Sequence, residues 1–444
     1  MMKWLNKFII LIILLSSFLL AFPVFTSAKS AFEIECDNAQ YADAIYFYSY
    51  DAKSVLYSKN EKKIIYPAST VKIMTGLIAC ESLGNRLDER VTVTQEMLVG
   101  HSGTSMGLKA GMVLSVKDLM YGAICGGCND AAQALAVICC GSIEEFVKEM
   151  NKYATKLDMA ATIYKNPTGL DENGAQTTVF DIAILSKIAA KNSLYLDISS
   201  AKNYFYTDYN GNEAVIYNRN ALISHFTATQ YLNEYACGLN AGSTDKGGYV
   251  VSTLMKPNGA TYLCVIMGAQ YENREIYSYK IANELISKAT SKFGRIKISS
   301  KNEKISSLPI DCALSTEKNI SVSCVTESDV FAFIPKNTDL KKRLEYRAYF
   351  HDTELIAPIN EGDVLGGVNI YLDGKLIGST RIISSNSFKE NSFLIFMKNM
   401  KSFLISGYFL TFALIAIPSL AIFLYFDYVK FRRRKNVRYI KLWK

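Results

Sequence analysis

The pattern of apolar and polar positions predicts a mixed α+β domain over residues 29–294. Tyrosines and β-branched residues alternate with polar residues around Asp51–Lys53, which is typical of two strands joined by a turn. From about Ser69 the apolar positions run almost all the way round a helix, so we expect this helix to be buried on most sides. The other predicted elements are helices at 117–140, 142–157, 180–191 and 274–290 and strands at 246–255 and 260–268. Strands at both ends of a helical middle indicate one sheet flanked by helices, whose first and last strands meet beside a helical region.

The periodicity changes near residue 295. Short runs of strict alternation follow, and Asp373-Gly374 between two of them is a signal for a type I′ turn. We therefore predict a small all-β domain, a β-sandwich, over 295–385, followed by a polar linker over 386–402.

Both ends of the chain differ from its middle. Residues 1–28 begin with basic residues, continue with an apolar run and end with small residues at Ala28. This order is typical of a cleaved signal peptide. The apolar run is also long enough for an uncleaved anchor. Residues 403–426 contain 24 positions without a charge, and a helix of that length reaches roughly 36 Å, enough to cross a hydrocarbon core of about 30 Å. These features predict an exported protein with one C-terminal transmembrane helix.

The distribution of charge sets the predicted orientation. The net charge is +8, of which the signal peptide carries +2 and the tail over 427–444 carries +7, which leaves −1 for the remainder. Positive residues stay on the cytoplasmic side, so we expect a single-pass protein of the cell membrane with a cytoplasmic tail and an extracytoplasmic main body. A nearly neutral main body argues against a nucleic-acid partner.

Ten cysteines are spread along the chain. An exported chain permits disulfides, but one of this size does not need them, and cysteine also packs as a small buried hydrophobe. We expect mostly free, buried thiols. The pair Cys125 and Cys128 lacks the second pair or nearby histidines of a zinc site, so we predict no metal; a Cys125–Cys128 bond or a reactive Cys128 thiol stays an alternative.

The strongest chemical signal is "YPASTVKIMTG", residues 66–76. Ser69 and Lys72 are three positions apart, so a helix starting here places them on one face. A serine hydroxyl needs a base to become a nucleophile, and a lysine in a dry pocket can lose its proton and act as that base. An exposed lysine on a capped helix would give the same short motif.

The wider sequence resembles the serine D-alanyl-D-alanine carboxypeptidases, the low-molecular-mass penicillin-binding proteins. The resemblance rests on the Ser69 motif together with "GTSMGLKAGMVLSVKDLMYG", "NDAAQALA", "YKNPTGLDENG" and "GLNAGST", which occur in the family's order. It implies a β-lactamase/transpeptidase-like domain, a β domain before a C-terminal membrane attachment, peptidoglycan stem peptides as substrate and β-lactams as covalent inhibitors. It implies no cofactor.

Two of the family's motifs are altered here. The second, Ser-x-Asn, falls on Gly127-Cys128-Asn129, so Asn129 is present and the serine position is Gly127. The third, Lys-Thr-Gly, falls on Asn240-Ala241-Gly242, so its lysine and threonine are missing, and Lys246 is a distant substitute for the lysine. The resemblance assigns catalysis to Ser69, Lys72 and Asn129, substrate binding to 240–242, and the oxyanion hole to the backbone N–H groups of Ser69 and Ser243.

These residues leave two hypotheses of different class. The first is a membrane-anchored carboxypeptidase that forms an acyl-enzyme on Ser69. We expect it to be slow, because the second-motif serine, which relays protons in the family, is missing, and general acid–base catalysis is worth about 10²–10⁴-fold. The second is a catalytically weakened relative that binds peptidoglycan or a partner without efficient turnover. A β-lactamase of related fold is disfavoured by the β domain and the C-terminal anchor.

Overall fold

The structure is a computed structural model that describes residues 32–435 except 101, 208–210, 212, 227, 315–319 and 353. The predicted signal peptide and the end of the basic tail lie outside the described residues. The chain divides into two compact units, Met1–Ile296 with Phe333–Thr338, and Lys297–Ala332 with Asp339–Lys444. It passes from one to the other in β12 (Phe293–Ser299), in β15 (Val330–Pro335) and after Thr338.

The first unit has a central antiparallel sheet in the order β2-β1-β9-β8-β7. Its strands are β1 (Ala44–Ser49), β2 (Ser54–Lys59), β7 (Ala236–Thr244), β8 (Gly248–Met255) and β9 (Tyr262–Ala269). Strand β1 pairs with β9, from Ala44 opposite Met267 to Ser49 opposite Tyr262, which confirms that the first and last predicted strands meet. Strand β7 is an edge of this sheet.

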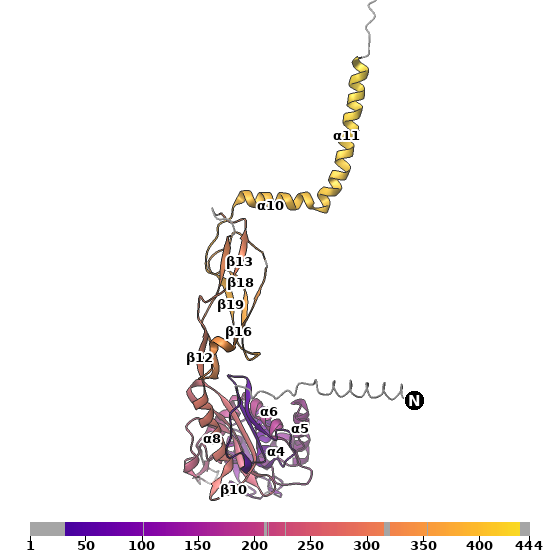
Figure 1. The fold of residues 1–444 in the computed structure, drawn as a ribbon. Coiled ribbons are helices and arrows are strands. Elements are labelled where there is room, and N and C mark those ends of the chain that lie inside the picture. Colours follow the sequence, from indigo (N-terminus) through magenta and orange to yellow (C-terminus); the bar gives the residue numbers. More distant parts are fainter. Residues whose placement is uncertain are drawn as a thin grey trace, which may run out of the picture. The chain divides into compact units, whose positions relative to one another are not determined.

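Helices lie on both sides of the sheet. They are α2 (Val71–Leu83), α3 (Val116–Met120), α4 (Asn129–Cys140), α5 (Ile143–Lys156), α6 (Val179–Ala189), α7 (Ser193–Ser200) and α8 (Tyr277–Lys292). Some pack against the strands of the sheet and others, such as α4 and α5, against α2. Figure 1 shows α8 on one side of the strands and α4, α5 and α6 on the other. Helix α2 lies at the centre, where eleven of its thirteen residues are buried, as its all-round apolar pattern predicts.

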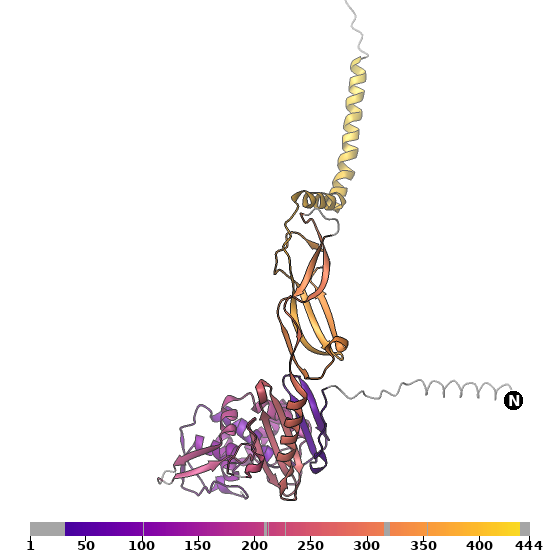
Figure 2. The same cartoon turned by 60° about the vertical axis from the view of Figure 1, so that its left-hand side comes forward.

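Three small antiparallel pairs complete this unit: β3 (Arg90–Thr92) with β4 (Val113–Ser115), β5 (Asn203–Thr207) with β6 (Glu213–Tyr217), and β10 (Tyr271–Glu272) with β11 (Glu275–Ile276). The hairpin of β5 and β6 stands out from the helical region at the lower left of Figure 2. The helix predicted at 117–140 is interrupted, because a π-helical turn at Tyr121–Cys125 and a left-handed Gly127 (φ +66°) separate α3 from α4.

The second unit is built on a six-stranded sheet in the order β16-β18-β19-β14-β13-β17. Its strands are β13 (Lys304–Asp311), β14 (Ser321–Thr326), β16 (Leu344–Phe350), β17 (Leu355–Ile356), β18 (Val364–Leu372) and β19 (Lys375–Ser384), with the short helix α9 (Leu340–Arg343). Both turn residues between β18 and β19 have positive φ, +50° at Asp373 and +78° at Gly374, as a type I′ turn requires. The predicted mixed α+β fold with a following β domain is confirmed.

The C-terminal segment holds two helices, α10 (Ser392–Ile405) and α11 (Gly407–Lys435). Helix α10 occupies most of the segment for which we predicted a polar linker, and it is capped by Asn391, whose Oδ1 accepts from the backbone N–H of Phe393 at 3.1 Å. Ser406 has an extended backbone and separates the two helices, so the long apolar helix begins at Gly407 and not at 403. Its stretch Gly407–Arg433 is long and apolar enough to cross a membrane.

Candidate active site

The first element of the site is the turn that carries Ser69. A 3₁₀ turn, Ala68–Thr70, leads directly into α2, and Ser69 is half-buried while both of its neighbours are fully buried. Ala68 has φ +47°, a left-handed conformation that is uncommon for a residue with a side chain. The backbone therefore holds the Ser69 side chain at the surface of a closed core.

A loop that the sequence reasoning gave no role supports this turn. Gly169 has φ +83°, and a Cβ at Gly169 would overlap the Ala68 carbonyl oxygen and lie 2.7 Å from its carbon. Asn166 fixes the loop, because its Oδ1 accepts from the backbone N–H of Gly169 at 2.8 Å and from Thr168 Oγ1 at 3.0 Å. The Asn-Pro-Thr-Gly sequence of this loop is a turn signal that could have pointed to it.

Lys72 lies one turn further along, inside α2. Its side chain is 3% exposed, and Nζ donates a hydrogen bond of 2.6 Å to the carbonyl oxygen of Thr168 in the same loop. The pKa of Lys72 is lowered to about 7, mainly by burial; Cys128 opposes this shift and the positive charge of Arg219 adds to it. A lysine with such a pKa is partly uncharged at neutral pH and can accept a proton.

Strand β7 faces the Ser69 hydroxyl. A side chain at Gly242 would overlap Ser69 Oγ, and its Cβ would lie 2.6 Å from Ser69 Cβ. Side chains alternate along a strand, so Asn240 shares the face of Gly242, while Ala241 and Ser243 point to the other face. Asn240 is buried, and its Oδ1 makes no hydrogen bond with the described residues. The predicted third motif thus adjoins the predicted nucleophile.

The second predicted motif lies at the start of α4. Cys128 precedes the helix, and Asn129 is its first residue. The Asn129 side chain is buried, donates to the Ser102 carbonyl oxygen through Nδ2, and leaves Oδ1 without a hydrogen-bond partner among the described residues. Asp130 next to it accepts from the backbone N–H of Leu108 at 3.0 Å and from Ser105 Oγ at 2.6 Å, which holds the loop over residues 102–108 against the site.

Gly127 opens a space that Arg219 borders. A Cβ at Gly127 would lie 3.4 Å from both Cβ and Cγ of Arg219 and 4.0 Å from the Ala241 carbonyl oxygen. The structure therefore brings the second motif, the third motif and Arg219 together. Sequence reasoning missed Arg219, because nothing in the local pattern over 216–223 distinguishes it from a surface arginine.

The two cysteines beside the motif are buried and protonated at neutral pH. Burial raises the pKa of both Cys125 and Cys128 to about 12, so neither is a reactive thiolate. All ten cysteines lie in the described part of the chain, where none forms a disulfide and five are buried. No group of metal-ligating side chains is found in that part of the chain.

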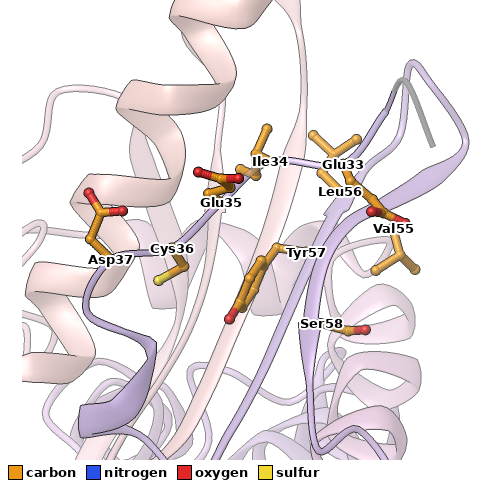
Figure 3. Close-up of a pocket in the computed structure, with 9 residues that line it drawn as sticks. All are labelled: Glu33, Ile34, Glu35, Cys36, Asp37, Val55, Leu56, Tyr57 and Ser58. Carbon is orange, nitrogen blue, oxygen red and sulfur yellow. The ribbon is translucent and has the colours of Figure 1, made fainter. Parts of the chain in front are cut away.

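A pocket lies apart from these motifs, on the outer side of β2. Figure 3 shows this pocket, of about 650 Å³, between the segment 33–37 and strand β2. Asp37 forms an ion pair with Lys288 at 2.8 Å, and burial raises the pKa of the Cys36 thiol to about 12. Asp37 is paired and the Cys36 thiol is protonated, so neither supplies a base or a nucleophile like those of the first site.

These features define the class of protein as an α+β domain with a serine at the start of a buried helix, beside an edge strand and a lysine of lowered pKa. Residues 32–271 match the D-alanyl-D-alanine carboxypeptidase family, and residues 293–390 match the C-terminal domain of penicillin-binding protein 5. The first match spans more than half of the chain. The chain belongs to the D-alanyl-D-alanine carboxypeptidase family.

Individual relatives agree with this assignment. The chain is 26% identical over 412 residues to the D-alanyl-D-alanine carboxypeptidase DacF of Bacillus subtilis, which covers 87% of this chain and 97% of that protein. It is 28% identical over 382 residues to DacA of Haemophilus influenzae, covering 82% and 91%. Among solved structures, penicillin-binding protein 5 of Haemophilus influenzae aligns with a TM-score of 0.55 and 27% identity over 79% of this chain and 98% of that one.

The close approach of Ser69 to β7 gives a first prediction. Replacing Gly242 by alanine should lower the rate of acylation by penicillin by about 10²-fold, because the new methyl group must displace the Ser69 hydroxyl. Stopped-flow or gel-based labelling with a fluorescent penicillin measures this rate. Gly294→Ala is the matched control, since a Cβ there meets only the flexible Lys336 side chain, at 3.2 Å. Equal rates in both variants would show that Ser69 is not the reacting group.

Proposed function

We propose that the protein is a membrane-anchored, extracytoplasmic serine-type D-Ala-D-Ala carboxypeptidase that removes the terminal D-alanine from peptidoglycan stem peptides. The observation that carries this proposal is the Ser69 hydroxyl placed against Gly242, in a site whose buried Lys72 has a pKa near neutrality. The relatives named above are D-alanyl-D-alanine carboxypeptidases, which supports the substrate class.

The proposed reaction has two halves. Uncharged Lys72 takes the proton of Ser69, whose Oγ attacks the carbonyl carbon of the penultimate residue to form a tetrahedral intermediate. The backbone N–H groups of Ser69 and Ser243 stabilise its oxyanion, and the leaving amine of D-alanine takes up a proton as the C–N bond breaks. Water then hydrolyses the ester and regenerates the Ser69 hydroxyl.

Substrate binding in this proposal uses β7 and Asn129. An edge strand presents unpaired backbone N–H and C=O groups, to which an extended peptide can add as a further strand. The carboxamide of Asn129, with its buried unpartnered oxygen, accepts a hydrogen bond from a peptide N–H. Asn240, Ala241 and Gly242 line the same strand, and Gly127 leaves the position of the usual second-motif hydroxyl empty.

A second candidate function follows from Gly127 and Asn240. A site without the motif serine and the motif lysine has no proton relay and lacks one positive charge. The alternative is therefore a protein that acylates or binds the peptide without efficient release of D-alanine. One experiment separates the two. The full-length protein in detergent is incubated with a fluorescent penicillin and, separately, with a peptide ending in D-Ala-D-Ala.

A stable adduct mapped to Ser69 by mass spectrometry, together with release of D-alanine, is the result we expect for the carboxypeptidase. An adduct without release of D-alanine supports the weakened relative. If no adduct forms at millimolar penicillin, the proposed catalytic function is wrong.

Restoring the family's motif residues gives a second prediction. The triple variant Gly127→Ser, Asn240→Lys, Ala241→Thr should acylate at least about 10-fold faster than the parent, since a hydrogen bond to a charged group is worth about 1.5–3 kcal/mol. Labelling rates at matched protein concentration check this. The double variant Asn240→Lys, Ala241→Thr is the control, because a serine at 127 must adopt φ +66° beside Arg219. An unchanged rate in both variants would contradict the placement of the motifs.

The membrane part of the proposal rests on α11. The segment Gly407–Arg433 is long and apolar, and the following residues to 444 are basic. A single span with its basic end in the cytoplasm follows from the preference of positive residues for that side. Protease added outside intact cells should then digest the main body but leave the C-terminal tail protected.

A further inference from the structure

The hairpin of β5 and β6 is fixed to the protein by one of its two faces. Tyr204 stacks on Tyr121 of the π-helical turn, with ring centres 3.8 Å apart. Ile216 is buried, and its Cγ2 lies 2.7 Å from where a Cβ of Gly126 would stand. Tyr204 pairs with Ile216 across the two strands, so both side chains lie on this inner face. The rest of the hairpin projects from the helical region (Figure 2).

The outer face of the hairpin carries apolar side chains. Phe205 pairs with Val215, and side chains alternate along a strand, so Phe205, Val215 and Tyr217 share this face. Phe205 is 73% exposed, while Val215 and Tyr217 are half-buried. Phe226, from the loop after β6, stacks on Tyr217 with ring centres 3.6 Å apart and is itself 64% exposed. These four residues form one apolar strip on the surface.

The apolar strip adjoins the candidate active site. Arg219 follows Tyr217 by two positions, and its Cβ and Cγ lie 3.4 Å from where a Cβ of Gly127 would stand. Two residues of extended chain span at most about 7 Å, so Tyr217 lies within this distance of Arg219 along the chain. The strip therefore starts beside the second motif, and Val215 and Phe205 continue it along the hairpin.

The size and the border of the apolar strip favour a saccharide over a protein partner. A specific protein interface takes about 800 Å² and some 20–30 residues on each partner, far more than four side chains. The exposed residues Asn203, Thr207 and Glu213 share the outer face and border the strip with hydrogen-bonding groups. A pyranose ring fits this arrangement, because its C–H groups are attracted to the electron-rich face of an aromatic ring while its hydroxyl and acetamido groups reach the border.

The proposed substrate carries saccharide rings near the bond that is cut. A stem peptide is attached by its N-terminal end to the saccharide strand of peptidoglycan, and the proposed reaction cuts its C-terminal end at Ser69. The four residues before that bond in a five-residue stem span at most about 14 Å when extended. The sugars of a bound substrate therefore stay near the site, where the apolar strip begins.

We propose that the apolar strip of Phe205, Val215, Tyr217 and Phe226 binds the N-acetylated amino sugars of the peptidoglycan strand. The proposal rests on the proposed function, because the strip holds the saccharide part of the same substrate. Phe226 and Phe205 supply the exposed rings on which the sugars stack, and Tyr217 holds the Phe226 ring in place from below.

The test measures binding of chitotetraose, four linked N-acetylglucosamine units, to the full-length protein in detergent. Saturation-transfer NMR and calorimetry should detect binding to the parent. Phe226→Ala should weaken binding by about 2- to 10-fold, the effect of losing one stacked ring. Phe226→Trp should keep the affinity. Phe226→Leu keeps an apolar side chain but loses the flat ring, so it should bind as weakly as Phe226→Ala.

Tyr271→Ala is the matched control, because Tyr271 is also an exposed aromatic residue of a two-stranded hairpin, 58% exposed, and lies outside the strip. This variant should bind chitotetraose like the parent. Three results would overturn the proposal: no binding to the parent at the solubility limit of the sugar, an equal loss in Tyr271→Ala, or parent affinity in Phe226→Leu. The last result would indicate an apolar partner such as a protein segment. Thermal melting shows whether each variant keeps its fold.

Penicillin labelling tests the proposed function separately, because penicillin carries no saccharide. Phe226→Ala should be labelled at the parent rate. If the parent forms no penicillin adduct, the proposed carboxypeptidase function is wrong. Binding of chitotetraose to the parent, and its weakening in Phe226→Leu, still decide the role of the apolar strip.

Discussion

The Ser69→Ala variant is expected to form no covalent adduct with penicillin, a fall on the order of 10⁴-fold or more in the rate of labelling. Ser69 is the one half-buried residue in a turn whose other members are fully buried, and its hydroxyl lies against Gly242 of β7. In the proposed mechanism Lys72, whose pKa is lowered to about 7, takes its proton. Alanine keeps the backbone and removes only the oxygen that forms the ester. Gel fluorescence and intact mass measure the adduct.

Ser58→Ala is the matched control, because Ser58 is an exposed serine in β2. This variant protein should be labelled by penicillin at the parent rate. The Ser69→Ala variant should still bind the D-Ala-D-Ala peptide without reacting, which shows that the fold and the binding groups are kept. An adduct that persists in Ser69→Ala and maps to another residue would remove Ser69 from the mechanism. Cys128 is a poor substitute nucleophile, because burial raises the pKa of its thiol to about 12.

The strand and helix pattern of the first unit could be predicted because it is set by local periodicity and turns. The alternation over 44–57 became β1 and β2, and the all-round apolar pattern after Ser69 became the buried α2. The hairpin of β5 and β6 has the same alternation but was not predicted. Its exposed Phe205, 73% accessible, shows that an aromatic residue in a strand need not mark the core.

Helix α10 was missed for a different reason. Its apolar residues, among them Phe393, Phe396 and Phe403, remain exposed on the described protein, so they do not form the one-sided stripe by which a helix on a core is recognised. The preceding asparagines and lysines favoured a polar linker. The Asn391 cap was the local signal that could have indicated a helix start.

Only part of the site could be predicted from the sequence. The spacing of Ser69 and Lys72 is local, and the resemblance supplied Asn129 and the strand over 240–242. The loop over 166–169 and Arg219 reach the site through tertiary contacts, with Gly169 against Ala68 and Arg219 against Gly127. No periodicity records such contacts, so these two parts of the site could not be predicted from the local sequence.

The acylation rate of the parent should depend on the protonation of Lys72. Only the uncharged amine accepts a proton, and the pKa of Lys72 is about 7, so the rate should rise about tenfold per pH unit well below pH 7 and level off above it. Lys72→Met should lower the plateau by about 10²–10⁴-fold and remove this pH dependence, since methionine is of similar length but cannot act as a base. Penicillin labelling rates from pH 5 to pH 9 measure both effects.

A second substitution at the same position separates the base from the charge. Lys72→Arg keeps a cation that can donate to the Thr168 carbonyl, but a guanidinium stays protonated at every pH used, so this variant should be as slow as Lys72→Met. Lys72→Met leaves the Thr168 oxygen without its donor and should lose about 1–3 kcal/mol of stability, which thermal melting detects separately. If Lys72→Arg labelled at near the parent rate, Lys72 would act through its charge, and the base would have to be sought elsewhere in the site.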